Sequence, residues 1–451
     1  MPSVSPSYFR GAWIEPDDPA YEPARPVFNQ RADARPKVIA RCAGTSDVVA
    51  AVAHAREHGL RVDVRSGGYN LGGHTAGGGM VVDLSLMRAV QILPQQRMAR
   101  LQGGVRGGDL QIEATVHGLA GATGAVSRTG IGLMLAGGIG LLSSRIGYAS
   151  DNILAVELVT ATGEVVTASP DTKPDLFWAV RGSTGNFGVV TALEVRLHEI
   201  PPLVHMGMMS WPLDKLDGPI RALSDPDWAS DDLGLIGLFN SASLDGRGSL
   251  DIVVCHSGTE ETARADLERL RSLGALEADA VSPMTFREAS FFYDDLYGPM
   301  RATIDDQPVH ELGAGLVQAL VDKIREPAGG GLHAIEIVPL RGALARAPEF
   351  PSALREAEQE PGVGLGPAAW WEDASEDPLH DRWVAEVIEI IRRIGPTTEG
   401  QHPSGVGVTL DLRGVERMYG DRIGRLRELK RQWDPDNLFP GNHNIPPATA
   451  S

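Results

Sequence analysis

The chain has 451 residues, more than one ordinary hydrophobic core accommodates, so we expect two domains. Its 42% hydrophobic and 22% charged residues are typical of a globular protein, and 59 acidic against 41 basic residues give a net charge of −18. This charge disfavours a nucleic-acid or anionic-membrane partner. Two cysteines far apart, Cys42 and Cys255, disfavour a disulfide framework and a metal site. The N-terminus lacks a signal-peptide pattern, and no apolar stretch is long enough to span a bilayer, so we expect a cytoplasmic monomer or homodimer.

The first ordered segments predict a strand, a helix and a second strand that ends in a glycine turn. "KVIARC" is apolar and β-branched, which favours a strand. In "TSDVVAAVAHAREHG" apolar residues recur at helical spacing, with Thr45 or Ser46 as the expected N-cap and Gly59 at the end. "LRVDV" then favours a strand that leads into the turn "RSGGYNLGG".

The remainder of the first half alternates glycine turns with short elements. We expect a helix between Asp109 and His117, a hairpin in "NILAVELVTATGEVVTAS" with its turn at "ATG", and a long strand in "GVVTALEVRL". The pair Pro201–Pro202 indicates a domain boundary.

Beyond this boundary glycine is sparser, and long strands alternate with charged helices such as "TARADLERLRSL". Near Gly405 the chain returns to a predicted strand, "VGVTLDL", and a basic amphipathic helix in "YGDRIGRLRELKRQW". We therefore expect a first unit over residues 1–201, a second over 202–404, and a segment 405–451 that returns to the first.

Five glycine-rich turns lie beside strands in the first half of the chain. Backbone N–H groups in such turns bind phosphate oxygens, although tight turns in a domain of short strands would give the same pattern. No turn ends in the Gly-Lys-Ser/Thr of a P-loop, and none opens a helix in the manner of a Rossmann dinucleotide site.

Several motifs together resemble a known family. "RPKVIARCAGTSDVVAAVAHAREHGLRVDVRSGGYNLGG", "TGIGLMLAGGIGLLSSRIGYASDNILAVELVTATGEV", "LFWAVRGSTGNFGVVTALEVRL" and "DPDNLFPGNHNIPP" look like the berberine-bridge-like FAD-linked oxidases of the vanillyl-alcohol-oxidase (p-cresol-methylhydroxylase) superfamily. The resemblance covers nearly the whole chain in the same order. It implies an α+β fold, with a two-subdomain FAD-binding domain and a substrate domain of antiparallel sheet backed by helices.

The resemblance also implies which residues hold FAD. They are the turn after the second strand, the later glycine turns and their neighbours, the start of the long strand, and the C-terminal "NHNI": Arg65, Ser66, Gly67, Gly68, Tyr69, Asn70, Gly73, His74, Thr129, Gly130, Gly132, Gly137, Gly138, Gly140, Asp151, Asn152, Ile153, Val189, Val190, Asn442 and Asn444.

Tyr69 is the principal departure from the family. Most members carry a histidine there that is bonded to a ring methyl of FAD, and the second tether, a cysteine, is also absent around residues 125–128. His74 could replace the first tether only with a shift of register. We therefore expect non-covalent FAD, which should be a weaker oxidant than the tethered form, with Tyr69 as a spacer, a hydrogen-bond donor or a general acid/base.

The catalytic residues are less clearly marked. The tyrosine base of the family is missing from "VGVTLDL", where Asp411 is either a buried substitute or a solvated carboxylate. In "GLHAIEIVP" a flat strand would let only one of His333 and Glu336 face the flavin. Tyr293, Tyr297 and the pair Trp370–Trp371 could line an aromatic substrate pocket or pack in a core.

These observations predict an FAD-dependent oxidoreductase acting on a small or medium organic substrate, in specialised biosynthesis. Hydride would pass from a C–H bond next to oxygen or nitrogen, and molecular oxygen is a candidate final acceptor. The alternative is a non-redox cyclase or isomerase with structural FAD, since binding and orientation alone can supply much of a barrier reduction. A degenerate binding protein is a third option, against which the intact glycine turns argue.

Overall fold

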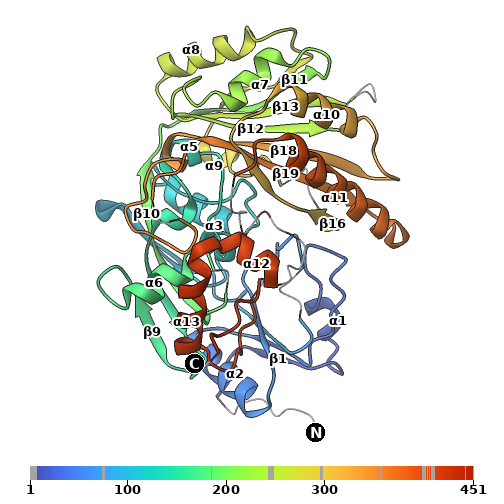
Figure 1. The fold of residues 1–451 in the computed structure, drawn as a ribbon. Helices are drawn as coiled ribbons and strands as arrows, with labels where there is room; N and C mark the ends of the chain where they lie inside the picture. The colour runs from blue at the N-terminus through green and yellow to red at the C-terminus, as the bar shows by residue number, and fades with distance from the viewer. Residues whose placement is uncertain are drawn as a thin grey trace.

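The computed structural model describes residues 8–73, 77–183, 185–241, 248–294, 298–355, 357–398, 403, 405, 407, 412–441 and 443–449. Its strands form three sheets, and helices accompany each of them. Figure 1 shows the third sheet with its helices in the upper half and the first two sheets in the lower half. The predicted α+β fold is confirmed.

The first sheet has four strands in the order β1-β2-β4-β3, of which β2, β4 and β3 are parallel. Its elements are β1 (Ala12–Ile14), α1 (Tyr21–Ala24), β2 (Val38–Arg41), α2 (Thr45–Glu57), β3 (Val62–Arg65) and β4 (Met80–Asp83). Val48, Val52 and Ala55 of α2 are fully buried against this sheet, as the helical spacing predicted.

The second sheet is antiparallel, with the order β5-β6-β10-β8-β9 and β7 paired to β10. Its strands are β5 (Val90–Leu93), β6 (Met98–Gln102), β7 (Leu119–Gly121), β8 (Ile153–Val159), β9 (Val165–Ala168) and β10 (Val189–Glu199). The accompanying helices are α3 (Gly107–Thr115), α4 (Ile131–Leu135), α5 (Ser143–Ile146) and α6 (Pro174–Val180), with 3-10 turns η1 (Pro94–Gln96) and η2 (Ala149–Asn152). The expected hairpin is present as β8 and β9, with Gly163 at φ +84° in its turn.

The third sheet has nine strands in the order β14-β11-β13-β12-β18-β19-β16, and β15 and β17 pair with β11 and β19. The strands are β11 (Val204–Pro212), β12 (Leu233–Asn240), β13 (Ser249–His256), β14 (Ala278–Asp279), β15 (Ser282–Met284), β16 (Arg301–Ile304), β17 (Gln307–Val309), β18 (Leu332–Leu340) and β19 (Gly362–Trp371). The helices of this half are α7 (Asp217–Ser224), α8 (Glu260–Arg271), α9 (Phe286–Ala289), α10 (Ala314–Ile324) and α11 (Asp377–Ile394), with η3 (Gly342–Leu344) and η4 (Ala374–Glu376). One apolar cluster joins the sheet to α7, α8, α10 and α11, which places the core of this half between them.

The C-terminal helices return to the first half. They are α12 (Leu412–Tyr419), η5 (Gly420–Arg422) and α13 (Ile423–Trp433), and Figure 1 draws them in red beside α6. Leu426 and Leu429 of α13 join the apolar cluster that contains Phe177 and Trp178 of α6, and the guanidinium carbon of Arg425 lies 4.0 Å from the centre of the Trp178 ring. Of the strand expected over "VGVTLDL", residues 406 and 408–411 lie outside the described part of the chain, and Leu412 begins α12.

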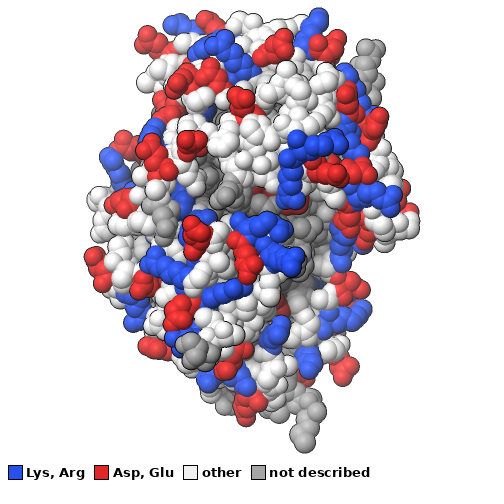
Figure 2. All heavy atoms as spheres, in the orientation of Figure 1, with Lys and Arg blue, Asp and Glu red and all other residues white. Residues whose placement is uncertain are grey.

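Lys, Arg, Asp and Glu are interspersed over the face drawn in Figure 2, and no broad basic patch interrupts them there. Such a face offers no concentrated field for a polyanion. None of the helices in the described residues has both the length and the apolar character needed to cross a membrane.

Candidate active site

The turn after β3 packs against the turn before α4 at a distance that only glycine permits. A Cβ atom added to Gly67 would lie 2.7 Å from the amide nitrogen of Gly130, and one added to Gly130 would lie 2.5 Å from the amide nitrogen of Gly67. Gly68 has φ +69°, which side chains disfavour. The two turns therefore form one continuous wall of exposed backbone.

This wall bounds a cavity of about 310 Å³, which we name the glycine-walled cavity. Its lining extends to Gly188 at the start of β10 and to Gly441 near the C-terminus. The predicted cofactor residues that line it are Ser66, Gly67, Gly68, Tyr69, Asn70, Thr129, Gly130, Gly132 and Val190.

The glycine-walled cavity suits the diphosphate and sugar of FAD. The Oγ atom of Ser66 is buried and has no hydrogen-bond partner among the described residues. A Cβ atom added to Gly132 or Gly185 would meet nothing within 4 Å, so both glycines leave room for a ligand against the backbone. A buried hydroxyl without a partner is costly unless a ligand satisfies it. The residues present thus fit a phosphate-bearing group.

Two charged residues predicted to bind FAD have structural partners instead. The guanidinium of Arg65 is buried and lies 3.1 Å from the Asp83 carboxylate. The Asp151 carboxylate lies 3.1 Å from the Arg355 guanidinium, and burial raises the pKa of Asp151. Neither residue lines the glycine-walled cavity. Buried charges require such partners, which explains both placements.

A second group predicted to bind FAD shapes the turn between α4 and β8. The carbonyls of Gly137 and Gly138 accept hydrogen bonds from Ser150 and Ala149, and the amide of Asn152 donates to two carbonyls of the same turn. These residues support the wall rather than line it. The other predicted residues outside the lining are Gly73, Gly140, Ile153, Val189 and Asn444. His74 and Asn442 lie outside the described residues.

Tyr69 is half-buried at the edge of the glycine-walled cavity. Its ring centre lies 4.0 Å from that of Phe28, with the planes tilted by 31°. Burial raises the pKa of Tyr69 to about 12, so the phenol is neutral. This packing on Phe28 holds the ring in place at the edge of the glycine-walled cavity.

A larger cavity of about 470 Å³, which we name the acidic cavity, adjoins the first. Both are lined by Leu71, Leu133, Ile139, Glu336 and Pro403. Its ionisable lining is mainly acidic, with four carboxylates against one guanidinium and one imidazole: Asp305, Asp306, Glu336, Glu360, Arg422 and His310. The phenols of Tyr148 and Tyr419 add polar groups. A pocket of this size accommodates a small organic molecule.

Glu336 stands where the two cavities meet. It lies in β18, and no hydrogen bond or ion pair joins its carboxylate to another described residue. Burial raises the pKa of Glu336 to about 7. A carboxyl group with this pKa can exchange a proton near neutral pH.

His333 lies on the opposite face of β18 from Glu336 and lines neither cavity. It is fully buried, and its Nε2 atom lies 3.0 Å from Nδ1 of His380 in α11. The ring centre of Trp383 lies 4.7 Å away. The strand's alternation puts His333 toward the helices and Glu336 toward the cavities.

The aromatic residues that the sequence assigned either to a substrate pocket or to a core lie away from both cavities where they are described. Tyr293 packs in an apolar cluster with Phe286, and neither it nor the pair Trp370–Trp371 lines either cavity. The indole N–H of Trp371 donates to Asp377 at the start of α11. Tyr297 and Asp411 lie outside the described residues. Sequence analysis missed Asp305, Asp306, Tyr148 and Tyr419, which reach one cavity from three separate segments and carry no common motif.

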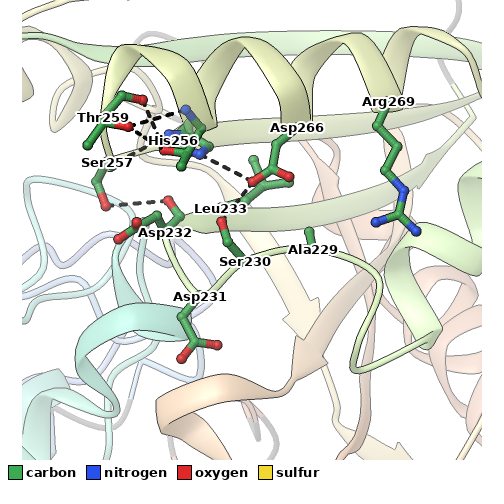
Figure 3. Close-up of polar contacts among 12 residues, drawn as sticks. Ala229, Ser230, Asp231, Asp232, Leu233, His256, Ser257, Thr259, Asp266 and Arg269 are labelled. Carbon is green, nitrogen blue, oxygen red and sulfur yellow. Dashed lines mark hydrogen bonds and ion pairs between the residues drawn. The ribbon is translucent and has the colours of Figure 1, made fainter.

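A polar cluster lies in the half of the molecule built on the third sheet, and its residues line neither cavity (Figure 3). Asp266 of α8 accepts a hydrogen bond from Ser230 at 2.7 Å and lies 3.3 Å from the Nε2 atom of His256. A serine nucleophile needs its hydroxyl bonded to the histidine, whereas here Ser230 donates to the aspartate. The cluster therefore ties α8 to β13 and to the segment before β12.

Two segments of the chain match described protein families. Residues 36–169 match the family described as "FAD binding domain", and residues 409–446 match "Berberine and berberine like". The first segment contains β2 to β9, including the two turns that carry Gly67 and Gly130.

Individual proteins are similar over the whole chain. The (R)-6-hydroxynicotine oxidase of Paenarthrobacter nicotinovorans is 34% identical over 98% of each chain. The crystal structure of 6-hydroxy-D-nicotine oxidase from Arthrobacter nicotinovorans superposes with a TM-score of 0.88 at 33% identity, covering 99% of this chain and 100% of that one. Xylooligosaccharide oxidase from Myceliophthora thermophila, at 22% identity and a TM-score of 0.84 over 98% of both chains, shares the fold. This chain belongs to the berberine-bridge-like family of FAD-linked oxidoreductases.

Proposed function

We propose that this FAD-linked oxidoreductase oxidises an amine at the carbon next to nitrogen, with Glu336 as the base. The observation that carries the proposal is the position of the Glu336 carboxylate, which has no partner among the described residues, at the junction of the two cavities. Asp305 and Asp306 line the same cavity and favour a cationic ligand. A 34% identical relative is named for its action on 6-hydroxynicotine, which is an amine.

In this proposal Glu336 accepts the proton from the substrate nitrogen. An amine enters mainly as its ammonium form, whose nitrogen lone pair is occupied and cannot assist oxidation. The raised pKa of Glu336, about 7, makes the carboxylate a suitable proton acceptor near neutrality. FAD, when bound, supplies the two-electron acceptor for the neighbouring C–H bond. Molecular oxygen is the proposed final acceptor.

FAD would be held mainly by residues 1–201 and 405–451, and the substrate by residues 202–404. Ser66 and the backbone of Gly67, Gly130 and Gly132 would contact the diphosphate and its sugar chain. The lining of the acidic cavity from β18 and β19 would hold the amine over the junction.

We also propose that FAD is bound without a covalent link. The proposal takes Tyr69 to replace the linking histidine, and the neutral phenol of Tyr69 packs on Phe28. Cys42 and Cys255 are both buried and line neither cavity. Acid precipitation of the purified protein should therefore release yellow FAD into the supernatant, whereas colour retained in the pellet would disprove this arrangement.

Anaerobic mixing tests the amine assignment. 6-Hydroxynicotine and N-methylbenzylamine should bleach the flavin absorbance, and xylobiose should not. Readmission of air should restore the colour if oxygen is the acceptor. Bleaching by the sugar alone would refute the assignment, and an amine that binds and is transformed without bleaching would favour the non-redox alternative.

A further inference from the structure

The strand β19 carries glycine at three alternating positions, Gly362, Gly364 and Gly366, which all line the acidic cavity. The intervening Val363 and Leu365 point the other way, where both are fully buried in the core. In the sheet Gly366 pairs with Glu336, and Gly364 pairs with Val338, both of which line the same cavity. One wall of the cavity is therefore bare backbone beside the proposed base.

Glycine weakens a strand, so each position needs a reason. Gly362 has one, because an added Cβ atom would lie 2.7 Å from the carbonyl oxygen of Val309. At Gly364 and Gly366 the nearest described atoms to an added Cβ are 3.7 and 3.4 Å away, which is ordinary contact. None of the three has a positive φ. Neither backbone conformation nor packing among the described residues requires glycine at 364 and 366.

We propose that Gly364 and Gly366 determine substrate size, by letting a flat fused-ring system lie directly on the backbone of β19 while its amine reaches Glu336. The inference rests on the proposed amine function. Side chains two residues apart on a strand are separated by about 7 Å, so the bare stretch matches two or three fused rings in length. A side chain at 364 would fill this space without touching the cofactor cavity, whose lining does not include the residue.

Three amines of increasing ring size test this inference: N-methylbenzylamine, N-methyl-1-naphthylmethylamine and N-methyl-9-anthracenylmethylamine. The measured quantity is the half-saturating concentration for anaerobic flavin bleaching, or for perturbation of the flavin spectrum where an amine binds without reaction. The holoprotein is compared with Gly364→Ala and Gly364→Val. Gly315→Ala is the matched control, since Gly315 lies in α10, lines neither cavity and would meet nothing within 4 Å.

We expect Gly364→Val to raise the half-saturating concentration of the three-ring amine by about tenfold, and that of the one-ring amine by less than about twofold, with Gly364→Ala between wild type and valine. The FAD content and melting temperature should not fall. Equal effects on all three amines, or no effect on any, would overturn the inference while leaving the amine function in place. Failure of the wild type to bind any of the amines would overturn both proposals.

Discussion

Glu336 differs from the other carboxylates of the acidic cavity because it also borders the glycine-walled cavity. Its predicted role makes activity depend on its deprotonated form. Since burial raises the pKa of Glu336 to about 7, kcat/KM for an amine should rise from pH 6 to pH 8 with a midpoint near 7. Glu336→Gln should lower kcat by about 100-fold or more and abolish this midpoint, as measured by stopped-flow flavin bleaching. A Gln variant with the wild-type pH profile would exclude Glu336 as the base.

Glu336 should also make stability depend on pH, but stability should fall as pH rises, whereas activity should rise. The folded protein holds the proton on Glu336 more tightly than the unfolded chain does, so its free energy of unfolding falls as pH rises from about 4.5 to 7. Replacing the carboxylate with an amide, as in Glu336→Gln, removes this pH-dependent fall in the free energy of unfolding. The melting temperature of Glu336→Gln should therefore match that of wild type at pH 4 and exceed it at pH 8. A difference independent of pH would indicate only a change in packing.

A separate prediction concerns Tyr69. Its ring packs on Phe28, and this contact does not need the hydroxyl group. An aromatic pair contributes about 1 kcal/mol, so Tyr69→Ala should weaken FAD binding by roughly fivefold. Tyr69→Phe should stay within about twofold of wild type in a fluorescence titration of apoprotein with FAD. If the Phe variant loses affinity as the Ala variant does, the hydroxyl itself binds the cofactor.

At the scale of elements, helix α13 secures the C-terminal segment through a buried ion pair. The Nζ atom of Lys430 lies 2.6 Å from Asp434 and donates to the carbonyls of Asn186 and Phe439. Lys430→Met leaves the Asp434 carboxylate buried without its partner, which costs about 3–5 kcal/mol. Chemical denaturation should show this loss, and FAD should dissociate more readily because Gly441 lines its cavity. The double variant Lys430→Met/Asp434→Asn is the control and should recover part of the stability.

The elements also show what the sequence could and could not reveal. Helix α2 was predictable because its apolar spacing is local, but its N-cap is Gly44 rather than Thr45 or Ser46. The reason is tertiary: the carboxylate of Asp47 accepts hydrogen bonds from the amides of Arg10, Gly11 and Ala43. Hydrogen bonds between segments more than thirty residues apart do not change the local spacing of apolar residues. The sequence pattern therefore could not reveal them.

The candidate site also has one part that the sequence could predict and another that it could not. The glycine turns were predictable because close backbone approach demands glycine wherever it occurs, as at Gly67 and Gly130. The alternation of β18 showed that only one of His333 and Glu336 could face the flavin. The alternation could not show which of the two residues it is. One face of β18 lies against α11 and the other face lines the cavities, so a polar side chain on either face is enclosed.

At the scale of the whole molecule, Asn29 joins the two halves around the cavities. Its side chain exchanges hydrogen bonds with both backbone groups of Ala302 in β16 and donates to the carbonyl of Leu71, which lines both cavities. Asn29→Ala leaves these buried groups unpaired, at a cost of about 1–3 kcal/mol for each. Hydrogen exchange should accelerate in residues 300–304 and near residue 71 while the core of the third sheet is unchanged. The exposed Arg35→Ala variant should leave all of these rates as they are.

The wall of the glycine-walled cavity is built from distant parts of the chain, which affects when the protein can bind its cofactor. The glycine-walled cavity draws its lining from Val62 through to Gly441, and Asn186 is hydrogen-bonded to His443 and Ile445. During synthesis the first two sheets leave the ribosome long before the segment that completes this wall. The wall is therefore complete only when Gly441 has joined it, and we expect stable cofactor binding to require the C-terminal segment. Removal of Gly441 and the residues after it would take Gly441 from the cavity wall and the fully buried Ile445 from the apolar cluster that contains Trp178, and we expect it to weaken flavin retention.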